Sequence, residues 1–82
     1  MNEIKFSKWI KFEHYPPKEG KKTSLWIIKT KDDDITLGLI KWYSSWRTYS
    51  FFPANDTIYE DDCLTDIANF IKDKMDERKE QE

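Results

Sequence analysis

Apolar and polar residues alternate with a period of two along most of the chain, a pattern that predicts β-strands. The predicted strands are residues 3–13, 24–30, 35–43 and 46–52. Towards the C-terminus the period changes, because Leu64, Ile67 and Ile71 recur at helical spacing and predict a helix over residues 62–79. The order indicates one α+β domain over residues 1–82, a four-stranded antiparallel meander with one C-terminal helix packed on one face.

The last two predicted strands, 35–43 and 46–52, predict a hairpin whose turn is Ser44 and Ser45. With a two-residue loop, Tyr43 pairs with Trp46, Trp42 with Arg47, Ile40 with Tyr49 and Gly38 with Phe51. Tight two-residue turns favour Asn and Gly over Ser, so a longer loop with a shifted register is the alternative. A glycine at position 38 either leaves room for an opposing ring such as Phe51 or marks a bulge.

Both faces of this hairpin are rich in apolar residues. One predicted face carries Gly38, Ile40, Trp42, Arg47, Tyr49 and Phe51, and the other carries Leu37, Leu39, Lys41, Tyr43, Trp46, Thr48, Ser50 and Phe52. An antiparallel sheet with one solvated face alternates apolar with polar residues, so two apolar faces indicate that something covers each of them. The helix accounts for one face, and we expect a second copy of the protein or another partner to cover the other.

The first predicted strand also has one apolar row, formed by Ile4, Phe6, Ile10 and Phe12. Lys8 interrupts this row, as expected for a lysine at the edge of a sheet. The segment after it contains two prolines and Gly20 and is predicted to be a basic loop, since proline removes a backbone donor. The next strand, residues 24–30, is apolar at its centre, as in a strand buried on both faces.

Charge is distributed unevenly along the chain, although the net charge is only −2. Residues 1–53 contain ten Lys or Arg and six Asp or Glu, whereas residues 54–82 contain four and ten. The acidic balance argues against general affinity for nucleic acids. At the start of the helix, Asp61 or Asp62 is the expected N-cap. The basic half leaves one alternative, a groove that binds a single strand through Lys29, Lys31, Lys41, Arg47 and Trp42.

Candidate catalytic and metal-binding residues are few. Cys63 and His14 are the only residues of their types, so no internal disulfide forms, and a Cys in a first helical turn that faces a core usually acts as a small apolar residue. Asp32, Asp33 and Asp34 lack the glycine and distal glutamate of a calcium loop. Two glycines do not build a phosphate-binding loop. We therefore expect no enzyme, no cofactor and no metal site.

The N-terminal segment lacks the apolar run of a signal peptide, and no segment reaches the length of a membrane span. A single cysteine is consistent with a reducing compartment. The expected location is the cytoplasm, without membrane attachment.

A family resemblance rests on a motif that begins with the sequence LGLIKWY at residues 37–43, followed by Trp46, Arg47, Tyr49 and the sequence FFP at 51–53. It continues in the helix with Cys63, Leu64, Asp66, Ile67, Phe70 and Ile71. This pattern, over residues 25–72, resembles small phage and prophage-type proteins of uncharacterised function. The resemblance implies a phage or mobile-element setting, where small acidic proteins often bind host or phage proteins. It implies no catalytic residue.

These observations favour a small non-enzymatic protein-interaction module that presents one sheet face to a partner protein or to a second copy of itself. The candidate interaction residues are Lys41, Trp42, Tyr43, Trp46, Arg47 and Tyr49. Aromatic and arginine side chains are the usual anchors of protein interfaces. Binding of single-stranded nucleic acid through the same basic-aromatic face is the alternative hypothesis, and a steep salt dependence of binding would distinguish it.

Overall fold

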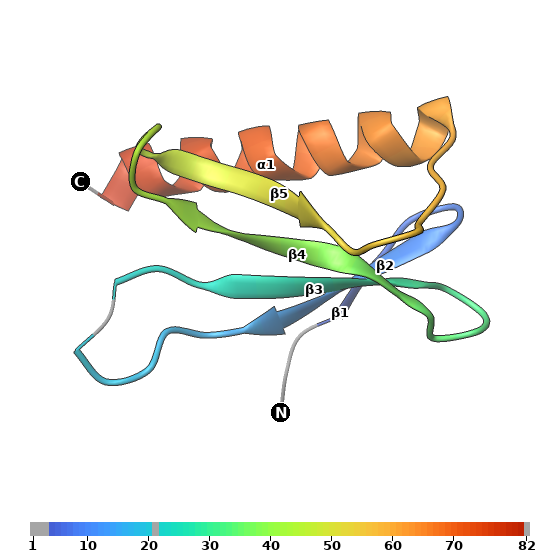
Figure 1. Cartoon of the computed structure of the whole chain (residues 1–82). Helices are drawn as coiled ribbons and strands as arrows, with labels where there is room; N and C mark the ends of the chain where they lie inside the picture. Colours follow the sequence, from blue (N-terminus) through green and yellow to red (C-terminus); the bar gives the residue numbers. More distant parts are fainter. Residues whose placement is uncertain (1–3, 21, 82) are drawn as a thin grey trace.

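A five-stranded antiparallel sheet with one helix across one side forms the protein, as seen in a computed structural model that describes residues 4–20 and 22–81 (Figure 1). The strands are β1 (Ile4–Phe6), β2 (Ile10–Tyr15), β3 (Leu25–Thr30), β4 (Thr36–Tyr43) and β5 (Thr48–Pro53), and the helix is α1 (Asp61–Gln81). Their order in the sheet follows their order in the chain. The predicted α+β meander with a C-terminal helix is therefore confirmed, but the prediction of four strands is wrong.

The additional strand arises because the segment predicted as one strand over residues 3–13 folds back on itself. Its first predicted residue, Glu3, lies outside the described residues. Residues 7–9 form a turn in which the Ser7 amide donates to the Ile10 carbonyl at 2.8 Å. Lys8 therefore lies in an exposed turn and does not interrupt an inward row. The reversal also separates the predicted apolar row, because Ile10 is buried while Ile4 remains 45% exposed.

The hairpin between β4 and β5 has the longer loop of the two alternatives. Tyr43 pairs with Thr48 and Ile40 with Phe51, so residues 44–47 form a four-residue turn and the two-residue register is wrong. The Trp46 amide donates to the Tyr43 carbonyl at 3.2 Å, which closes the turn. The register is displaced by two residues, an even number, so the strand residues keep their predicted faces.

A β-bulge between β3 and β4 changes one predicted face. Ile28 pairs with Gly38 but Lys29 pairs with Thr36, so Leu37 is an extra residue in β4. Its side chain is 7% exposed and belongs to the core, contrary to its predicted place beside Leu39. The bulge lies next to Gly38, where one was anticipated.

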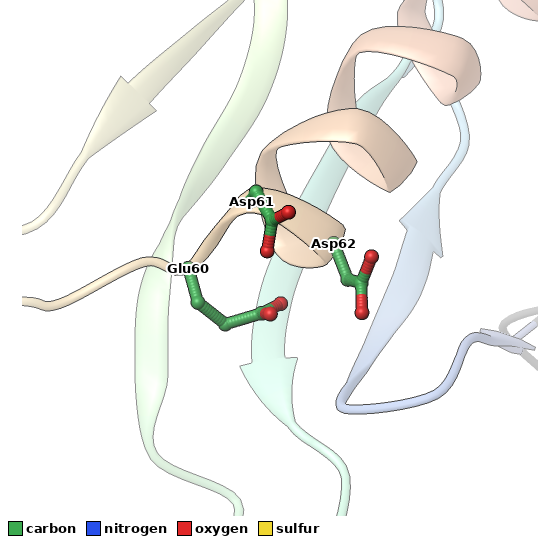
Figure 2. A group of neighbouring side chains, drawn as sticks. All are labelled: Glu60, Asp61 and Asp62. Atoms are coloured by element: carbon green, nitrogen blue, oxygen red, sulfur yellow. The ribbon is translucent and has the colours of Figure 1, made fainter.

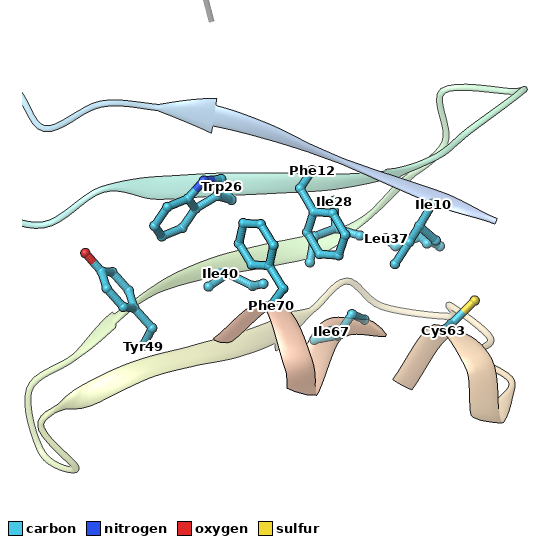
Figure 3. Packing of buried hydrophobic residues seen from close by; sticks show 10 residues of the cluster. All are labelled: Ile10, Phe12, Trp26, Ile28, Leu37, Ile40, Tyr49, Cys63, Ile67 and Phe70. Atoms are coloured by element: carbon cyan, nitrogen blue, oxygen red, sulfur yellow. The ribbon is translucent and has the colours of Figure 1, made fainter. Parts of the chain in front are cut away.

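The core lies between the sheet and α1 and is largely aromatic (Figure 3). Phe12 of β2 and Phe70 of α1 stack with their ring centroids 4.2 Å apart. Trp26 of β3 contacts Phe70 and Tyr49 edge to face, at 5.3 and 5.1 Å. The remaining buried core residues are Ile10, Ile28, Leu37, Ile40, Cys63 and Ile67. Rings bury large areas, so few residues suffice to fix the helix on the sheet.

Glu60 caps α1, and the prediction of Asp61 or Asp62 in that role is wrong. The Glu60 carboxylate accepts a hydrogen bond from the Cys63 amide at 2.7 Å, and its carbonyl accepts from the Leu64 amide. Desolvation opposes ionisation of Glu60, but the hydrogen bonds from Cys63 and the neighbouring Asp residues outweigh it and lower its pKa. With this cap the helix begins one residue before its predicted bounds of residues 62–79, and its other end lies two residues beyond them.

Candidate functional site

The side of the sheet that faces away from α1, called the outer face below, has no covering element among the described residues (Figure 1). Paired residues in neighbouring antiparallel strands share a face, so the pairing defines its members. They are Ile4, Phe6, Lys11, Glu13, Tyr15, Leu25, Ile27, Lys29, Thr36, Leu39, Lys41, Tyr43, Thr48, Ser50 and Phe52. The outer face is thus mixed, with apolar side chains among lysines and hydroxyl groups.

One row of the outer face crosses all five strands. It consists of Ile4, Glu13, Ile27, Leu39 and Phe52, each paired with the next. Glu13 is the one charged member, and its carboxylate lies 3.1 Å from the Lys29 ammonium. Ile27, Leu39 and Phe52 lie side by side on β3, β4 and β5, so these three residues form a continuous apolar strip on the surface, and Glu13 separates it from Ile4.

Charges at one end of the outer face are paired with each other. Lys11 forms an ion pair with Asp34, and Lys29 forms one with Glu13. The hydrogen bond with Glu13 raises the pKa of Lys29, and the hydrogen bond from Lys11 lowers the pKa of Asp34. No salt bridge between described residues involves Lys41, which lies near the opposite end. The positive charge available to a partner is therefore concentrated around Lys41.

That opposite end is aromatic, and Lys41, Tyr43, Trp46 and Phe52 are together called the aromatic corner. Tyr43 contacts Trp46 and Phe52 edge to face, with centroids 5.0 and 6.0 Å apart. The Lys41 ammonium lies 4.7 Å from the centre of the Phe52 ring, within cation-π range. Trp46 is 72% exposed. A large exposed ring, held by a neighbouring ring at a hairpin turn, is suited to enter a partner's pocket.

A groove of about 420 Å³ adjoins the aromatic corner. Its floor includes Leu25 and Ile27 of β3, and Lys41 borders it on one side. Pro16 and Pro17, in the loop after β2, form another wall. Sequence reasoning treated β3 as buried on both faces and the prolines as a loop, so it missed this groove. The two adjacent prolines beside an apolar strand were the available signal.

The structure divides the six predicted interaction residues among three places. Lys41, Tyr43 and Trp46 come together in the aromatic corner. Trp42 and Tyr49 lie on the helix side, where their rings contact each other at 5.3 Å. Arg47 is in the turn, with a left-handed φ of 54°, and it does not pair with Trp42. The Trp42 ring instead lies under the guanidinium of Arg78 of α1, whose Cζ atom is 4.4 Å from the ring centre.

The proposed nucleic-acid groove is divided in the same way. Trp42 faces the helix side while Lys29 and Lys41 face outwards, and Arg47 lies in the turn. Lys29 is also bonded to Glu13. The sheet therefore does not bring this set of cations and its ring together on one face.

His14 and Cys63 do not form a nucleophilic pair. The His14 Nε2 atom lies 2.9 Å from the Ser24 hydroxyl, and the His14 ring stacks on Trp26. Figure 3 shows Cys63 and Trp26 at opposite ends of the core cluster. Burial raises the pKa of the Cys63 thiol, and the hydrogen bond with Glu60 adds to that effect. Cys63 is a buried core residue with a weakly nucleophilic sulfur.

Three carboxylates at the start of α1, from Glu60, Asp61 and Asp62, lie within 4.8 Å of one another (Figure 2). All three residues are exposed. Glu60 is occupied as the helix cap, and Asp62 lies 3.8 Å from the Lys8 ammonium. Negative charge is stabilised at a helix N-terminus, which explains the cluster without a bound ion. In the part of the chain that the structure describes, no helical segment has the sustained apolar sequence needed to cross a bilayer.

Comparison with known proteins gives one informative match. No family model matches the chain, and no solved structure matches it. The chain is 39% identical, over 61 residues, to the uncharacterized 9.3 kDa protein of Acholeplasma phage L2, an alignment that covers 74% of this chain and 78% of the relative. The sequence motif described above stays a prediction. At this identity and coverage, the chain belongs to the family of small phage proteins represented by that relative.

Proposed function

We propose that this protein is a non-enzymatic interaction module that binds a partner protein on the outer face of its sheet. The observation that supports the proposal is the partly exposed apolar strip of Ile27, Leu39 and Phe52 across β3, β4 and β5, which no described element covers and which ends at the aromatic corner. Exposed apolar patches of this kind typically mark sites of protein contact. The phage origin of the related protein is consistent with such a role.

The charges around the strip favour a particular kind of partner. Lys41 adjoins the strip, Lys18 lines the groove, and the carboxylate of Glu13 is already bonded to Lys29. A partner that combines apolar anchors with carboxylates would satisfy both the strip and the lysines. Two copies in face-to-face contact across a two-fold axis would instead bring lysines near lysines. We therefore favour an acidic protein partner over a homodimer.

The proposal includes the absence of catalysis. The candidate nucleophiles are the buried thiol of Cys63 and the hydroxyl of Ser24. His14, the only histidine, contacts Ser24 and does not contact Cys63. Neither lies on the outer face. Binding at the strip requires apolar contact and charge complementarity but no nucleophile.

The test compares capture of a partner by the wild-type protein and by variants of the aromatic corner. Immobilised protein is incubated with a lysate of the cells that express it. A captured protein that the wild type retains and the aromatic-corner variants lose is identified and purified for titration. Trp46→Ala removes the most exposed ring of the corner, and we expect at least about a tenfold loss of affinity. Trp9→Ala is the matched control, because Trp9 is also exposed, at 50%, but lies in the turn between β1 and β2.

Lys41→Glu and Lys41→Arg test the charge of the partner. The reversal should weaken binding of an acidic partner, while the arginine variant should retain it. Equal binding by wild type, Trp46→Ala and Lys41→Glu would refute the proposal. Light scattering over a dilution series tests the homodimer, since a second copy on the strip would give a mass that rises with concentration.

A further inference from the structure

A pocket of about 320 Å³ lies on the other side of the sheet, between the last turns of α1 and the ends of β2, β3 and β5. Its polar lining consists of His14, Lys22, Ser24, Lys74, Glu77 and Arg78. Trp26 and Tyr49 also line it. The outer-face proposal makes no use of this constellation.

The hydroxyl and imidazole groups of the pocket are fixed in position. The Ser24 amide donates a hydrogen bond to the Tyr49 hydroxyl at 3.2 Å, and the Ser24 hydroxyl lies 2.9 Å from His14 Nε2. The His14 ring is held against Trp26, with centroids 5.1 Å apart and planes 19° from parallel. Because core rings fix these groups, a ligand meets donors that are already oriented.

Cations outnumber carboxylates around the pocket, although the chain as a whole carries a charge of −2. Lys22, Lys74 and Arg78 are positive, and Glu77 is the one carboxylate among the described lining residues. The Lys74 ammonium lies 3.1 Å from Glu77 and 5.6 Å from the centre of the Trp26 ring. These cations also offset the partial negative charge at the helix C-terminus.

A second pocket of about 290 Å³ continues the first along the same side of the sheet. The two pockets share His14, Trp26 and Lys74, and the second adds Lys5. The Lys5 ammonium lies 5.6 Å from the centre of the Phe70 ring. The seam between helix and sheet therefore carries positive charge along both pockets.

We propose that this seam binds a phosphate group, either free or carried by a small organic molecule. Phosphate oxygens accept hydrogen bonds from side chains of the types in this lining, namely lysine, arginine, serine and histidine. The described lining residues include three cations and one carboxylate, so they carry a net positive charge. The two adjoining volumes leave space for an organic group beside the phosphate. The site is independent of partner binding on the outer face, so either proposal can fail alone.

The experiment follows the ring resonances of His14 by NMR at constant pH and ionic strength. His14 is the only histidine, so its signals report on this pocket without overlap. Inorganic phosphate is titrated against a chloride control, and a nucleoside monophosphate is titrated separately. We expect saturable shifts with phosphate and a dissociation constant on the order of 1 mM, with tighter binding of the nucleotide if the organic group also contacts the seam.

Substitutions at two neighbouring positions should change the phosphate affinity in opposite directions. Lys74→Gln should weaken phosphate binding at least about fivefold, whereas Glu77→Gln should strengthen it about twofold or more. Lys72→Gln is the matched control, since Lys72 lies on the same helix but is exposed and outside both pockets. Lys22→Gln repeats the test in a loop, where no core ring depends on the side chain.

Thermal unfolding of each variant shows whether a loss of binding reflects a loss of structure, because Lys74 also lies over rings of the core. A shift with phosphate that does not saturate, or that equals the chloride control, would overturn the proposal. Equal affinity in wild type, Lys22→Gln and Glu77→Gln would overturn it as well, since the charges around the pocket would then have no effect.

Discussion

Gly38 of β4 lies in close contact with β5, and its replacement by alanine should destabilise the whole domain. A Cβ atom at this position would lie 2.6 Å from the backbone oxygen of Phe52 and 2.7 Å from the nearest ring carbon of Phe51. Both distances are far shorter than ordinary van der Waals contact. The carbonyl belongs to the backbone of β5, so it cannot rotate away as a flexible side chain would.

Two effects of opposite sign determine the size of the loss. Overpacking in a filled core costs about 1–3 kcal/mol. Alanine recovers roughly 0.5–1 kcal/mol, because glycine loses more backbone entropy when it is held in a strand. We expect a net decrease of about 1–2 kcal/mol in the free energy of unfolding, out of a total of roughly 4–12 kcal/mol for a chain of this length. The midpoint of thermal unfolding should fall by roughly 5–15 °C.

Urea denaturation followed by tryptophan fluorescence measures the change. Phe51→Leu removes the ring that a Cβ at position 38 would meet but leaves the Phe52 carbonyl in place. The double variant Gly38→Ala/Phe51→Leu should therefore lose less free energy of unfolding than the sum of the two single losses. Ser50→Ala is the control, because Ser50 lies in β5 on the outer face and should change stability by less than about 0.5 kcal/mol. A neutral or stabilising Gly38→Ala substitution would show that the two strands are not in this close contact.

Three further predictions concern the hairpin turn, the helix cap and the cysteine. Arg47→Gly should raise the midpoint of thermal unfolding, since glycine adopts a φ of 54° without strain; the gain is up to about 1 kcal/mol. Glu60 ionises more readily in the folded protein, so its contribution to stability is present above the pKa of an unfolded glutamate, about 4.3, and is lost as the pH falls through the lower folded value. Glu60→Gln should therefore flatten the pH dependence of unfolding in that acidic range. Cys63 should react slowly with a thiol reagent in the native protein and rapidly in urea, because burial raises its pKa and limits access. Equal rates in both states would contradict its place in the core.

The hairpin shows how far local pattern determines the fold. Ile40 and Trp42 share one face and Leu39 and Lys41 share the other, as predicted, even though the predicted register was displaced by two residues. Alternation survives any even displacement, so a wrong loop length left these faces correct. Leu37 was misplaced because a bulge adds one residue, an odd displacement, and the predicted faces did not include the bulge that Gly38 indicated as an alternative.

The first hairpin shows what local pattern misses. The period of two from Ile4 to Phe12 contains no glycine or proline and is broken only at Lys8, a break that was assigned to the edge of a sheet and not to a turn. A contact distant in sequence accompanies the turn, since the Ser7 hydroxyl donates to the Asp66 carboxylate on α1. The positions of Trp42 and Arg47 were misjudged for a similar reason. Their faces depend on the turn and on Arg78 of the helix, neither of which a strand pattern contains.

Core packing on the helix side of the sheet determines which residues of each strand lie on the outer face. Neighbouring residues in β4 face opposite ways, so Ile40 can fill the core only if Leu39 and Lys41 face outwards. A slip of one residue would exchange the two sets, and the buried bulge at Leu37 and the close approach at Gly38 both oppose it. Core packing alone does not require leucine at position 39, because Thr48 and Ser50 occupy the same face of β5 as polar residues. The apolar side chains of the strip therefore meet a requirement that packing against the helix does not impose, which is why we assign them to a partner.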